Sequence, residues 1–532
     1  MLKLTVKSIR YKKQSQKGAN MKLATSKMIS MIDKYSKDEL GIPIKELMDK
    51  SGEAVAKAIR EIAPKNKPVV ILAGKGNNGG DGYAAALKIM NDYEVTVYDI
   101  FGKGQKNEEG KAFLEKYVAN GGKKVNFAPT EDILTYIKNA GCIVDAVFGT
   151  GFQGEMPEEI RPLAITIRES VEAKKIAVDV PLGINADNGS VSEFAISVDI
   201  TVELSFIKPG IISYPARSYV GKVMYDDIGL PRDKIVENFS FRYHMIDEEW
   251  IKRNLLPREE NSNKGSFGKL LMITGSRKYR GAAHLSLEAG LRGGVGLVTF
   301  VGASELISDL SLKYPEAIYK EIDIENISEG ELEAIVKLSS AHTATLVGSG
   351  SDNTDGLLAL TLGLLASEGG TLILDADAIN ALASIGEDGV RAIREAKREV
   401  ILTPHPLEFA RLIGTDVASV QLSRLAKAEK FAEENSCTLV LKGAGTIITN
   451  GREVYINTAG SSALAKAGSG DVLAGFMGAF TAQKKSTSEK SAAIAVYYHA
   501  TAGDSLAAEY SAYGVTPSDL PKEIARQLSA SS

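Results

Sequence analysis

Short apolar runs rich in β-branched residues alternate with amphipathic segments along most of the chain. The first runs are VVILAG (69–74) and VTVYDI (95–100), and each leads into a polar or glycine-rich loop. Further runs are CIVDAVFGTG (142–151), KIAVDVPLGIN (175–185) and DITVELSFIKPG (199–210). Runs that are apolar throughout are typical of strands buried on both faces of a parallel sheet. Apolar positions spaced by three and four residues predict helices between them.

The alternation restarts after PREENSNKGSFGK (257–269), a polar segment typical of a boundary or surface loop. The runs after it, with their loops, are LLMITGSRKYRGAA (270–283), LVTFVG (297–302), TLVGSG (345–350), TLILDADAIN (371–380), VILTPHPLEF (400–409), TLVLKGAGTIITN (438–450) and EVYIN (453–457). We therefore predict an α/β protein of two tandem three-layer α/β/α domains with mostly parallel sheets. A Rossmann-like domain is expected at residues 22–235 and a second α/β domain at residues 236–532.

Composition narrows the classes of function. The net charge of −4 argues against a protein that binds nucleic acid by neutralising phosphates. The two cysteines, Cys142 and Cys437, fit neither a metal site nor a disulfide framework, so we expect a cytoplasmic protein. No apolar run reaches membrane-spanning length. Residues 1–21 are basic and lack the apolar core of a signal peptide, and we predict a disordered extension there.

One stretch carries the strongest chemical signal: AKAGSGDVLAGFMGAF (465–480), a glycine turn followed by an acid and an apolar helix. Gly468 and Gly470 allow close approach of the backbone to a ligand. The free N–H groups of the first helical turn form an anion site. Asp471 would repel a phosphate there, so it is better suited to take a proton from a hydroxyl that reacts with that phosphate. The alternative is that Asp471 only caps the helix.

A second glycine-rich loop, GKGNNGGDG (74–82), follows a predicted strand and precedes a predicted helix. It contains a formal GxGxxG, which by itself favours a dinucleotide-binding dehydrogenase but is a weak signal. Asn77 and Asn78 add amide groups and Asp81 adds a carboxylate at the helix start. A glycine turn with a helix cap is the structural alternative.

Charged residues follow several other strands in the first half. Asp145 comes after a buried apolar run and is a candidate general base, cation ligand or structural cap. Asp179 occupies a similar strand end. Lys208 is a candidate partner for a phosphate or for one of these acids, and a surface lysine is the alternative.

The second half has its own polar strand ends. Asp375 and Asp377 are two residues apart, which in a strand places both carboxylates on one face, as a Mg²⁺ site would require. Helix capping is the alternative. His405 lies between two prolines, with Glu408 three residues on. Lys442 precedes two glycines after a strand, an arrangement that suits a nucleotide phosphate.

Together these motifs resemble the bifunctional NAD(P)H-hydrate repair enzymes. The first half resembles their epimerase domain through GNNGGDG, DAVFGTGFQGE, AVDVP and KPG…YP. The second half resembles their dehydratase domain, a ribokinase-like fold, through KGSFGKLLMITGS, RGAA, DADAIN, LTPHPLEF, LKGAGT and AGSGDVLAG. The resemblance covers nearly everything after about residue 22, and the ordered combination is specific although each motif alone is not.

The resemblance implies a repair function for NADH and NADPH that have been hydrated at the nicotinamide ring. One domain would interconvert the R and S epimers, and the other would dehydrate the S form while consuming ADP, with Mg²⁺ bridging the phosphates. Asp145 and Asn78 would ligate K⁺, and Asp471 would act as the base. The hydrated cofactor would contact Asn77, Asn78, Gly79, Gly80, Asp81, Gly149, Thr150, Gly151, Phe152, Gln153, Gly154, Glu155 and Asp179 in the first domain. In the second it would contact Ala282, Gly350, His405 and Asp471, with the nucleotide on Lys442, Gly443, Ala444, Gly445, Thr446 and Gly470.

The chain departs from the family pattern in four places. The usual VPSG reads Val180-Pro181-Leu182-Gly183, so leucine replaces a serine that helps bind K⁺. HPGE reads His405-Pro406-Leu407-Glu408, GPGLG reads Gly348-Ser349-Gly350-Ser351-Asp352, and TGN reads Ala459-Gly460-Ser461. The departure at Leu182 concerns the activity of the epimerase site, and the other three departures concern the activity of the dehydratase site.

Two alternative functions remain possible from the sequence. A ribokinase-class kinase of a stable small alcohol would share the GSGD turn, but the fused first domain argues against it. A non-catalytic nucleotide-binding scaffold is the third reading, against which Asn78, Asp145 and Asp471 argue. A homo-oligomer that binds small molecules, with no nucleic acid and no membrane, is expected. The choice between ADP and ATP is left open by the sequence.

Overall fold

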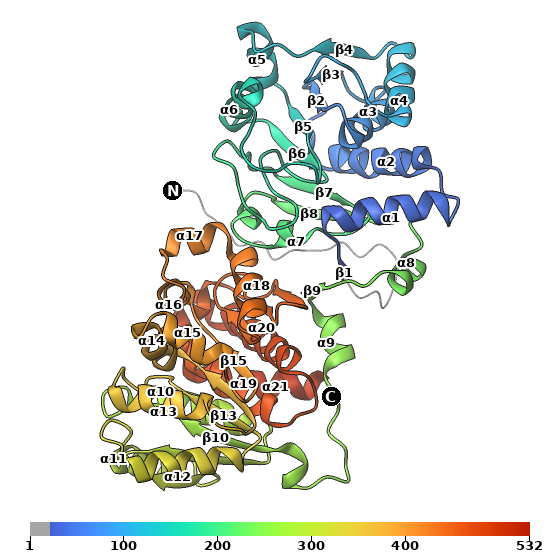
Figure 1. The fold of residues 1–532 in the computed structure, drawn as a ribbon. Coiled ribbons are helices and arrows are strands. Elements are labelled where there is room, and N and C mark those ends of the chain that lie inside the picture. Colours follow the sequence, from blue (N-terminus) through green and yellow to red (C-terminus); the bar gives the residue numbers. More distant parts are fainter. Residues whose placement is uncertain (1–21, 532) are drawn as a thin grey trace. The chain divides into compact units, whose positions relative to one another are not determined.

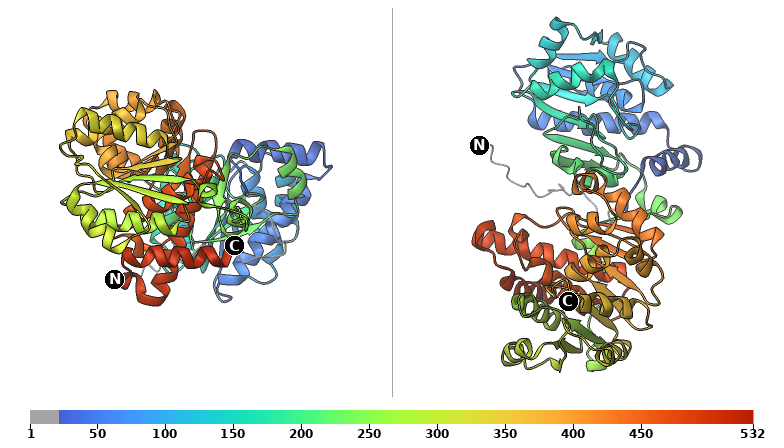
Figure 2. Two further views of the ribbon diagram at one scale, coloured as in Figure 1. Left: turned by 90° about the horizontal axis from the view of Figure 1, so that it is seen from below. Right: turned by 60° about the vertical axis from the view of Figure 1, so that its left-hand side comes forward.

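The computed structural model describes residues 22–531, so the extension predicted for residues 1–21 lies outside the described residues. Backbone contacts divide the chain into two compact units, with the division between Tyr243 and His244. Each unit has one main sheet with helices packed on both faces (Figures 1 and 2). The predicted fold class, mostly parallel α/β, is confirmed.

The sheet of the first unit is parallel throughout, in the order β4-β3-β2-β5-β6-β7-β8. Its strands are β2 (Val69–Ala73), β3 (Val95–Asp99), β4 (Lys123–Asn126), β5 (Cys142–Ala146), β6 (Lys174–Val178), β7 (Ile200–Leu204) and β8 (Lys222–Asp226), and a short β1 (Lys22–Leu23) precedes them. Along the chain, β3 and β4 are added on one side of β2, and β5 is then added on the other side of β2. The loops after β2 and β5 therefore diverge, which leaves a crevice at the carboxyl edge of the sheet.

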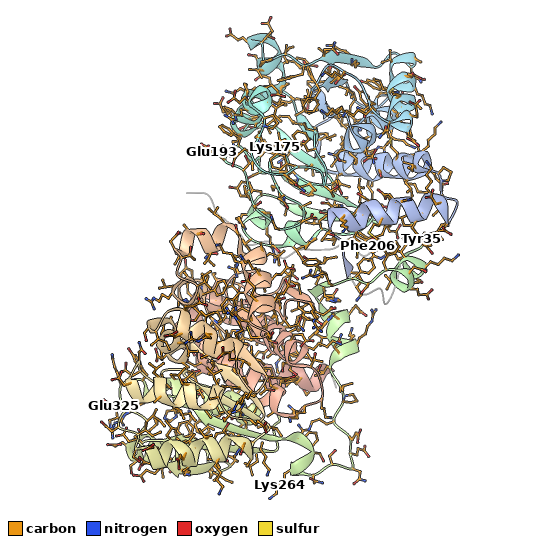
Figure 3. All side chains as sticks on the ribbon, viewed as in Figure 1. Tyr35, Lys175, Glu193, Phe206, Lys264 and Glu325 are labelled. Atoms are coloured by element: carbon orange, nitrogen blue, oxygen red, sulfur yellow. The ribbon has the colours of Figure 1, made fainter. Side chains whose placement is uncertain are left out.

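Alternating residues of the strands face two separate apolar cores. Val69 and Ile71 pack into the cluster that includes α2 and α3, whereas Val70 and Leu72 pack into the cluster that includes α5 and α6. The helices are α1 (Ser26–Asp38), α2 (Ile44–Ile62), α3 (Asn77–Ile89), α4 (Glu108–Ala119), α5 (Glu131–Lys138), α6 (Arg161–Glu169), α7 (Pro209–Ile212) and α8 (Arg232–Asn238). Side chains fill the space between these helices and the sheet (Figure 3).

The sheet of the second unit runs in the order β9-β18-β17-β16-β15-β14-β13-β10-β11-β12. Its strands are β9 (Tyr243–Ile246), β10 (Lys269–Ile273), β11 (Leu297–Gly302), β12 (Ile318–Glu321), β13 (Ala344–Val347), β14 (Thr371–Leu374), β15 (Val400–Leu402), β16 (Thr438–Leu441), β17 (Ile447–Thr449) and β18 (Val454–Asn457). The strands from β12 to β16 pair in parallel, and β16, β17 and β18 pair antiparallel. The order reverses between β10 and β13, which places a second crevice there.

Helices cover both faces of this sheet as well. Leu270 and Met272 of β10 pack against α10, α19 and α20, and the intervening Leu271 and Ile273 are buried on the opposite face. The helices are α9 (Glu248–Asn254), α10 (Arg280–Arg292), α11 (Ser304–Lys313), α12 (Glu329–Ser340), α13 (Asp355–Leu365), α14 (Ala376–Ser384), α15 (Glu387–Arg394), α16 (Pro406–Leu412), α17 (Val417–Leu422), α18 (Arg424–Glu434), α19 (Ser469–Ala482), α20 (Ser488–Gly514) and α21 (Leu520–Ser531). None of the helices within residues 22–531 has the length and apolar character needed to cross a bilayer.

Candidate functional site

A cavity of about 520 Å³ opens at the carboxyl edge of the first sheet. Its walls come from the loops after β2, β5 and β6 and from α1 and α2. The predicted residues Asn77, Asn78, Asp81, Gly149, Thr150, Gly151 and Asp179 all line it. Segments that are separated by about a hundred residues in the sequence thus form one cleft at the switch point of the sheet.

Seven other predicted residues of this unit do not line this cavity, and one of them is the buried Asp145. Gly79 and Gly80 lie within α3, where a Cβ would come within 1.9 Å of the Gly74 carbonyl oxygen and 2.7 Å of Met48, respectively. Phe152 is buried against Phe148, with ring centroids 5.7 Å apart. The remaining three, Gln153, Gly154 and Glu155, are exposed beyond the cleft wall. Gly79 and Gly80 therefore allow the start of α3 to pack closely against the residues around it.

Asn78 and Asp145 share one unusual property: both are buried polar groups without a charged partner in the described chain. Neither amide atom of Asn78 has a hydrogen-bond partner. The Asp145 carboxylate accepts only backbone N–H groups, from Val147 (3.1 Å) and Leu182 (2.6 Å), and burial raises the pKa of this carboxyl to about 7. A free amide oxygen in the first turn of α3 and an uncompensated carboxylate on β5 suit a monovalent cation. The Leu182 side chain lies in an apolar cluster and contributes only its backbone.

Lys208 is buried and pairs with acidic side chains inside the fold, so it is not a surface lysine. Its ammonium contacts Asp179, Glu203 Oε2 (3.1 Å) and the Leu204 carbonyl oxygen (3.0 Å). Burial acts to lower the pKa of Lys208, but the two carboxylates outweigh it and the pKa is raised. Asp179 has a φ of 67°, a strained value for a residue with a Cβ. A Cβ on Gly149 would lie 3.0 Å from Asp179 Oδ2, so the glycine makes room for this carboxylate at the cleft.

Several polar cleft residues were not among the predicted contacts, including Asp33 on α1, Ser51 on α2 and Lys75 after β2. The sequence contains a pattern that could have identified Asp33. Ile29 and Asp33 are four residues apart and therefore lie on one face of α1, which places an acid on the apolar face of an amphipathic helix.

In the second unit, the glycine turn before α19 has the predicted form. Gly468 is the N-cap, with a φ of 96°, and Asp471 is the third residue of the helix. Asp471 is therefore not the cap. Burial, and next to it the charge of Asp375, raise the pKa of Asp471 to about 7, while Lys442 acts in the opposite direction. A carboxyl with such a pKa exchanges protons readily near neutral pH.

The prediction that Asp375 and Asp377 lie on one face of a strand was wrong. β14 ends at Leu374, so Asp375 is the N-cap of α14 and Asp377 is in its first turn. Asp375 accepts bonds from Lys442 Nζ (2.8 Å), Ser349 Oγ (2.8 Å) and Thr403 Oγ1 (2.7 Å). Asp377 instead accepts the backbone N–H of Asp352 (3.0 Å). The two carboxylates diverge because the backbone turns into a helix between them.

Lys442 connects the predicted nucleotide-binding segment with the α19 turn. A Cβ on Gly470 would lie 3.6 Å from Lys442 Nζ. Burial acts to lower the pKa of Lys442, but Asp375 and then Glu408 outweigh it and raise the pKa. In the loop that follows, Gly443 and Ala444 are exposed, Gly445 is buried, and Thr446 Oγ1 donates to the Gly443 carbonyl oxygen (2.9 Å). The segment thus presents a cation beside a helix N-terminus.

The remaining predicted residues gather around the same strand ends. His405 caps α16: its Nδ1 accepts the N–H groups of Leu407 (3.1 Å) and Glu408 (3.2 Å). Burial raises the pKa of Glu408 to about 7, against the opposing charge of Lys442. At the switch point, a Cβ on Gly350 would lie 2.5 Å from the Ala282 Cβ, so these two predicted contacts are neighbours.

A metal centre made of side chains is not found in the described part of the chain, which has no group of three or more His, Cys, Asp and Glu placed to hold an ion. Any cation at either site would therefore depend on amide, backbone or ligand oxygens in addition to single carboxylates.

Two family models match the chain. The model described as YjeF-related protein N-terminus matches residues 44–210, and the model described as NAD(P)H-hydrate dehydratase matches residues 270–526. A bifunctional NAD(P)H-hydrate repair enzyme of Moorella thermoacetica is 31% identical over 519 residues, covering 94% of this chain and 95% of the relative. The enzyme of the same name from Escherichia coli is 32% identical over 491 residues, with coverage of 92% and 90%.

Solved structures include an ADP/ATP-dependent NAD(P)H-hydrate dehydratase from Bacillus subtilis, co-crystallised with ATP and Mg²⁺. It is 27% identical, has a TM-score of 0.48, and covers 54% of this chain and 98% of its own. The full-length relatives show the family, because they match both units in one chain. This chain belongs to the family of bifunctional NAD(P)H-hydrate repair enzymes.

Proposed function

We propose that this chain repairs hydrated NADH and NADPH with two active sites. The domain at residues 22–235 epimerises the R and S hydrates, and the domain at residues 236–532 dehydrates the S hydrate while converting ADP to AMP and phosphate. The division of the backbone between Tyr243 and His244 supports this assignment. The observation that carries the proposal is that relatives named for this repair match over nine-tenths of the chain.

In the dehydratase domain, Asp471 takes the proton of the ring hydroxyl as the phosphoryl group is transferred to its oxygen. The N–H groups of the first turn of α19 and the Lys442 ammonium stabilise the charge that develops on the phosphoryl oxygens. Phosphate is a better leaving group than hydroxide, so its departure restores the ring double bond. His405, Ala282 and Gly350 would hold the nicotinamide end of the substrate.

When bound together with the nucleotide, Mg²⁺ would supply positive charge that neutralises the phosphates. Asp375 is already engaged by Lys442, Ser349 and Thr403, so it does not fit as a direct ligand. We propose that phosphate and water oxygens hold the ion instead. Lys442 to Thr446 and Gly470 hold the nucleotide, with ADP as the phosphoryl donor.

In the epimerase domain, Asn78 and Asp145 fit K⁺ because the amide oxygen is free and the buried carboxylate lacks a cationic partner among the described residues. The ion would neutralise Asp145 and fix the loops after β2 and β5, which carry Asn77 and Gly149 to Gly151. Leu182 removes one hydroxyl ligand of the family pattern, and its backbone remains beside Asp145.

The expected setting is a reducing cytoplasm and a homo-oligomer. Both cysteines are unpaired and buried, and burial raises the pKa of each thiol to about 12, so neither is poised for disulfide exchange. Size-exclusion chromatography with light scattering tests the oligomeric state.

The decisive experiment follows recovery of NADH absorbance from a mixture of R and S hydrates, with ADP, Mg²⁺ and K⁺. We expect a fast phase from the S fraction and a second phase that is limited by epimerisation and completes the recovery. Parallel reactions with ATP determine the nucleotide preference. No recovery with either nucleotide would contradict the proposal and favour a kinase or a non-catalytic scaffold.

A further inference from the structure

Three carboxyl groups line the epimerase cleft, and they differ in their partners. Asp179 is ion-paired with Lys208. Asp81 is bonded to the Ser51 side chain. Asp33 has neither a hydrogen bond nor an ion pair with any residue in the described range 22–531. One of the three acids therefore faces the cavity with both oxygens unengaged.

Helix α1 holds Asp33 in a defined position. The Ser26 backbone N–H and Oγ bond to Asp187 Oδ1 (2.6 and 2.9 Å), and Ser26 Oγ also lies 3.0 Å from the Thr150 carbonyl oxygen. Farther along, Tyr35 of α1, labelled in Figure 3, packs edge-on against Phe239 with ring centroids 5.4 Å apart. Both contacts fix the helix to the unit that contains the cleft. Residues 26–38 lie before the region that the family model matches.

The chemistry of epimerisation requires a proton donor. Hydration of an enamine double bond places the hydroxyl on the carbon next to the ring nitrogen, and that carbon must lose and regain its C–O bond to invert. Hydroxide is a poor leaving group, so a positioned acid accelerates the cleavage. Asn78, Asn77 and the glycine loop offer no acidic proton. The cleft also contains lysines, but an ammonium group is in general a much weaker acid than a carboxyl group, so the cleft carboxyls are the better candidates.

We propose that Asp33 is the general acid of the epimerisation; this inference rests on the proposed function. The Asp33 carboxyl donates its proton to the ring hydroxyl as the C–O bond breaks, water leaves, and the ring nitrogen supplies the electron pair of the resulting C=N bond. Water then adds to the opposite face, the electron pair returns to nitrogen, and Asp179 accepts the proton that the added water loses. Proton exchange with solvent restores the starting state, so the step is a net isomerisation with no redox change.

The charges around the cleft support this division of roles. Asp179 is ion-paired with the Lys208 ammonium, an arrangement that suits the accepting role. Burial raises the pKa of Asp33 to about 6, with Lys208 lowering and Asp179 raising it. Asp81 is the third charged group that faces it, and burial together with Asp179 raises the pKa of Asp81 well above its usual value. A fraction of Asp33 is thus protonated at neutral pH.

The test compares Asp33→Asn with Asp38→Asn, a matched control on the exposed side of α1. Both proteins are mixed with the R and S hydrates, ADP, Mg²⁺ and K⁺. We expect the fast dehydration phase to be unchanged in both, because it reports the other active site. The slow phase of Asp33→Asn should fall about 10²- to 10⁴-fold toward the unaided rate, and that of Asp38→Asn should not change.

Two further measurements separate catalysis from structure. Asp33→Glu, which keeps the acid, should recover part of the slow phase, and substrate affinity should be the same in all variants. In the unaltered protein, the slow phase corrected for the unaided reaction should decrease as pH rises above about 6. A wild-type slow phase in Asp33→Asn, or a rate independent of pH from 5 to 8, would overturn the assignment. An unaltered protein whose slow phase equals the unaided rate would instead contradict the epimerase function itself.

Discussion

Each unit contains a largely buried lysine that is bound by a carboxylate at the carboxyl edge of its sheet, but these two lysines, Lys208 and Lys442, have different surroundings. Lys208 is 1% exposed and has two carboxylates, Asp179 and Glu203, as partners. Lys442 is 16% exposed, has Asp375 as its ion-pair partner and lies beside the first turn of α19. Lys208 is enclosed with its two carboxylates, whereas Lys442 is partly exposed and, in the function we propose, faces the nucleotide phosphates.

The two ion pairs illustrate two roles that a buried lysine can have in a site. In the first unit the lysine pairs with a strained aspartate at the cleft, and in the proposed epimerase site Asp179 is the functional group that Lys208 positions. In the second unit the aspartate positions the lysine, since Ser349 and Thr403 also hold Asp375 in place. The same ion pair thus presents an anion in one site and a cation in the other. The predictions below test this contrast, from the largest expected effect to the smallest.

The largest effect is expected for the base of the second site. Asp471→Asn keeps the shape of the turn but cannot accept a proton, so kcat for dehydration of the S hydrate should fall about 10²- to 10⁴-fold. Absorbance of recovered NADH measures this rate, and the R to S conversion should be retained. Asp388→Asn, an exposed aspartate in the same unit, is the control. Equal activity of the two variants would exclude Asp471 as the base.

Removal of the enclosed lysine should destabilise the first unit. Lys208→Met leaves Glu203 and Asp179 without their cation, which costs about 3–5 kcal/mol for a buried pair that loses one partner. Differential scanning calorimetry should show a lower Tm for the first unit, with dehydratase activity retained below that temperature. Lys174→Met on the exposed start of β6 serves as the control. An unshifted transition would mean that the lysine does not stabilise the fold.

The turn that carries Asp471 should respond to acid through His499. His499 Nε2 lies 3.0 Å from the Ser469 carbonyl oxygen, and burial lowers the pKa of His499 to about 4. The unfolded histidine binds a proton below its usual pKa of 6.5 while the folded one does not, so this stability is present above 6.5 and is lost as pH falls toward 4. Between pH 7 and pH 5 the unaltered protein should lose about 2 kcal/mol more unfolding free energy than His499→Gln. Equal losses in urea titrations would contradict this.

The smallest expected effect is the pH dependence of the two reactions, which compares the two sites directly. Asp471 must be ionised to accept a proton and its pKa is about 7, so kcat for dehydration should rise about tenfold from pH 6 to pH 8 and level off above that. The epimerisation phase should change in the opposite direction, because Asp33 must be protonated. Stopped-flow absorbance at fixed ionic strength measures both phases in one reaction. Parallel pH profiles for the two phases would show that one common group controls both.

Much of this organisation could be predicted from the sequence. Runs such as VVILAG and VTVYDI predicted buried parallel strands, and β2 and β3 lie there. The turn at Gly468 to Asp471 was predicted with its helix, because glycine spacing and an apolar run are local signals. The motifs also identified the family, which full-length relatives support.

Other features depended on tertiary structure. The strand assigned to Asp375 and Asp377 was wrong because the pattern of two acids is the same in a strand end and in a helix cap, and only the chain path after Leu374 distinguishes them. The partner of Lys208 was undecided because Glu203 and Asp179 approach it from two different strand ends. Local composition therefore determined the elements, the two α/β units and the candidate chemistry. Only the packing of α1 over the first sheet decided that Asp33 faces the cleft, because burial and charge at that carboxyl come from residues distant in the sequence.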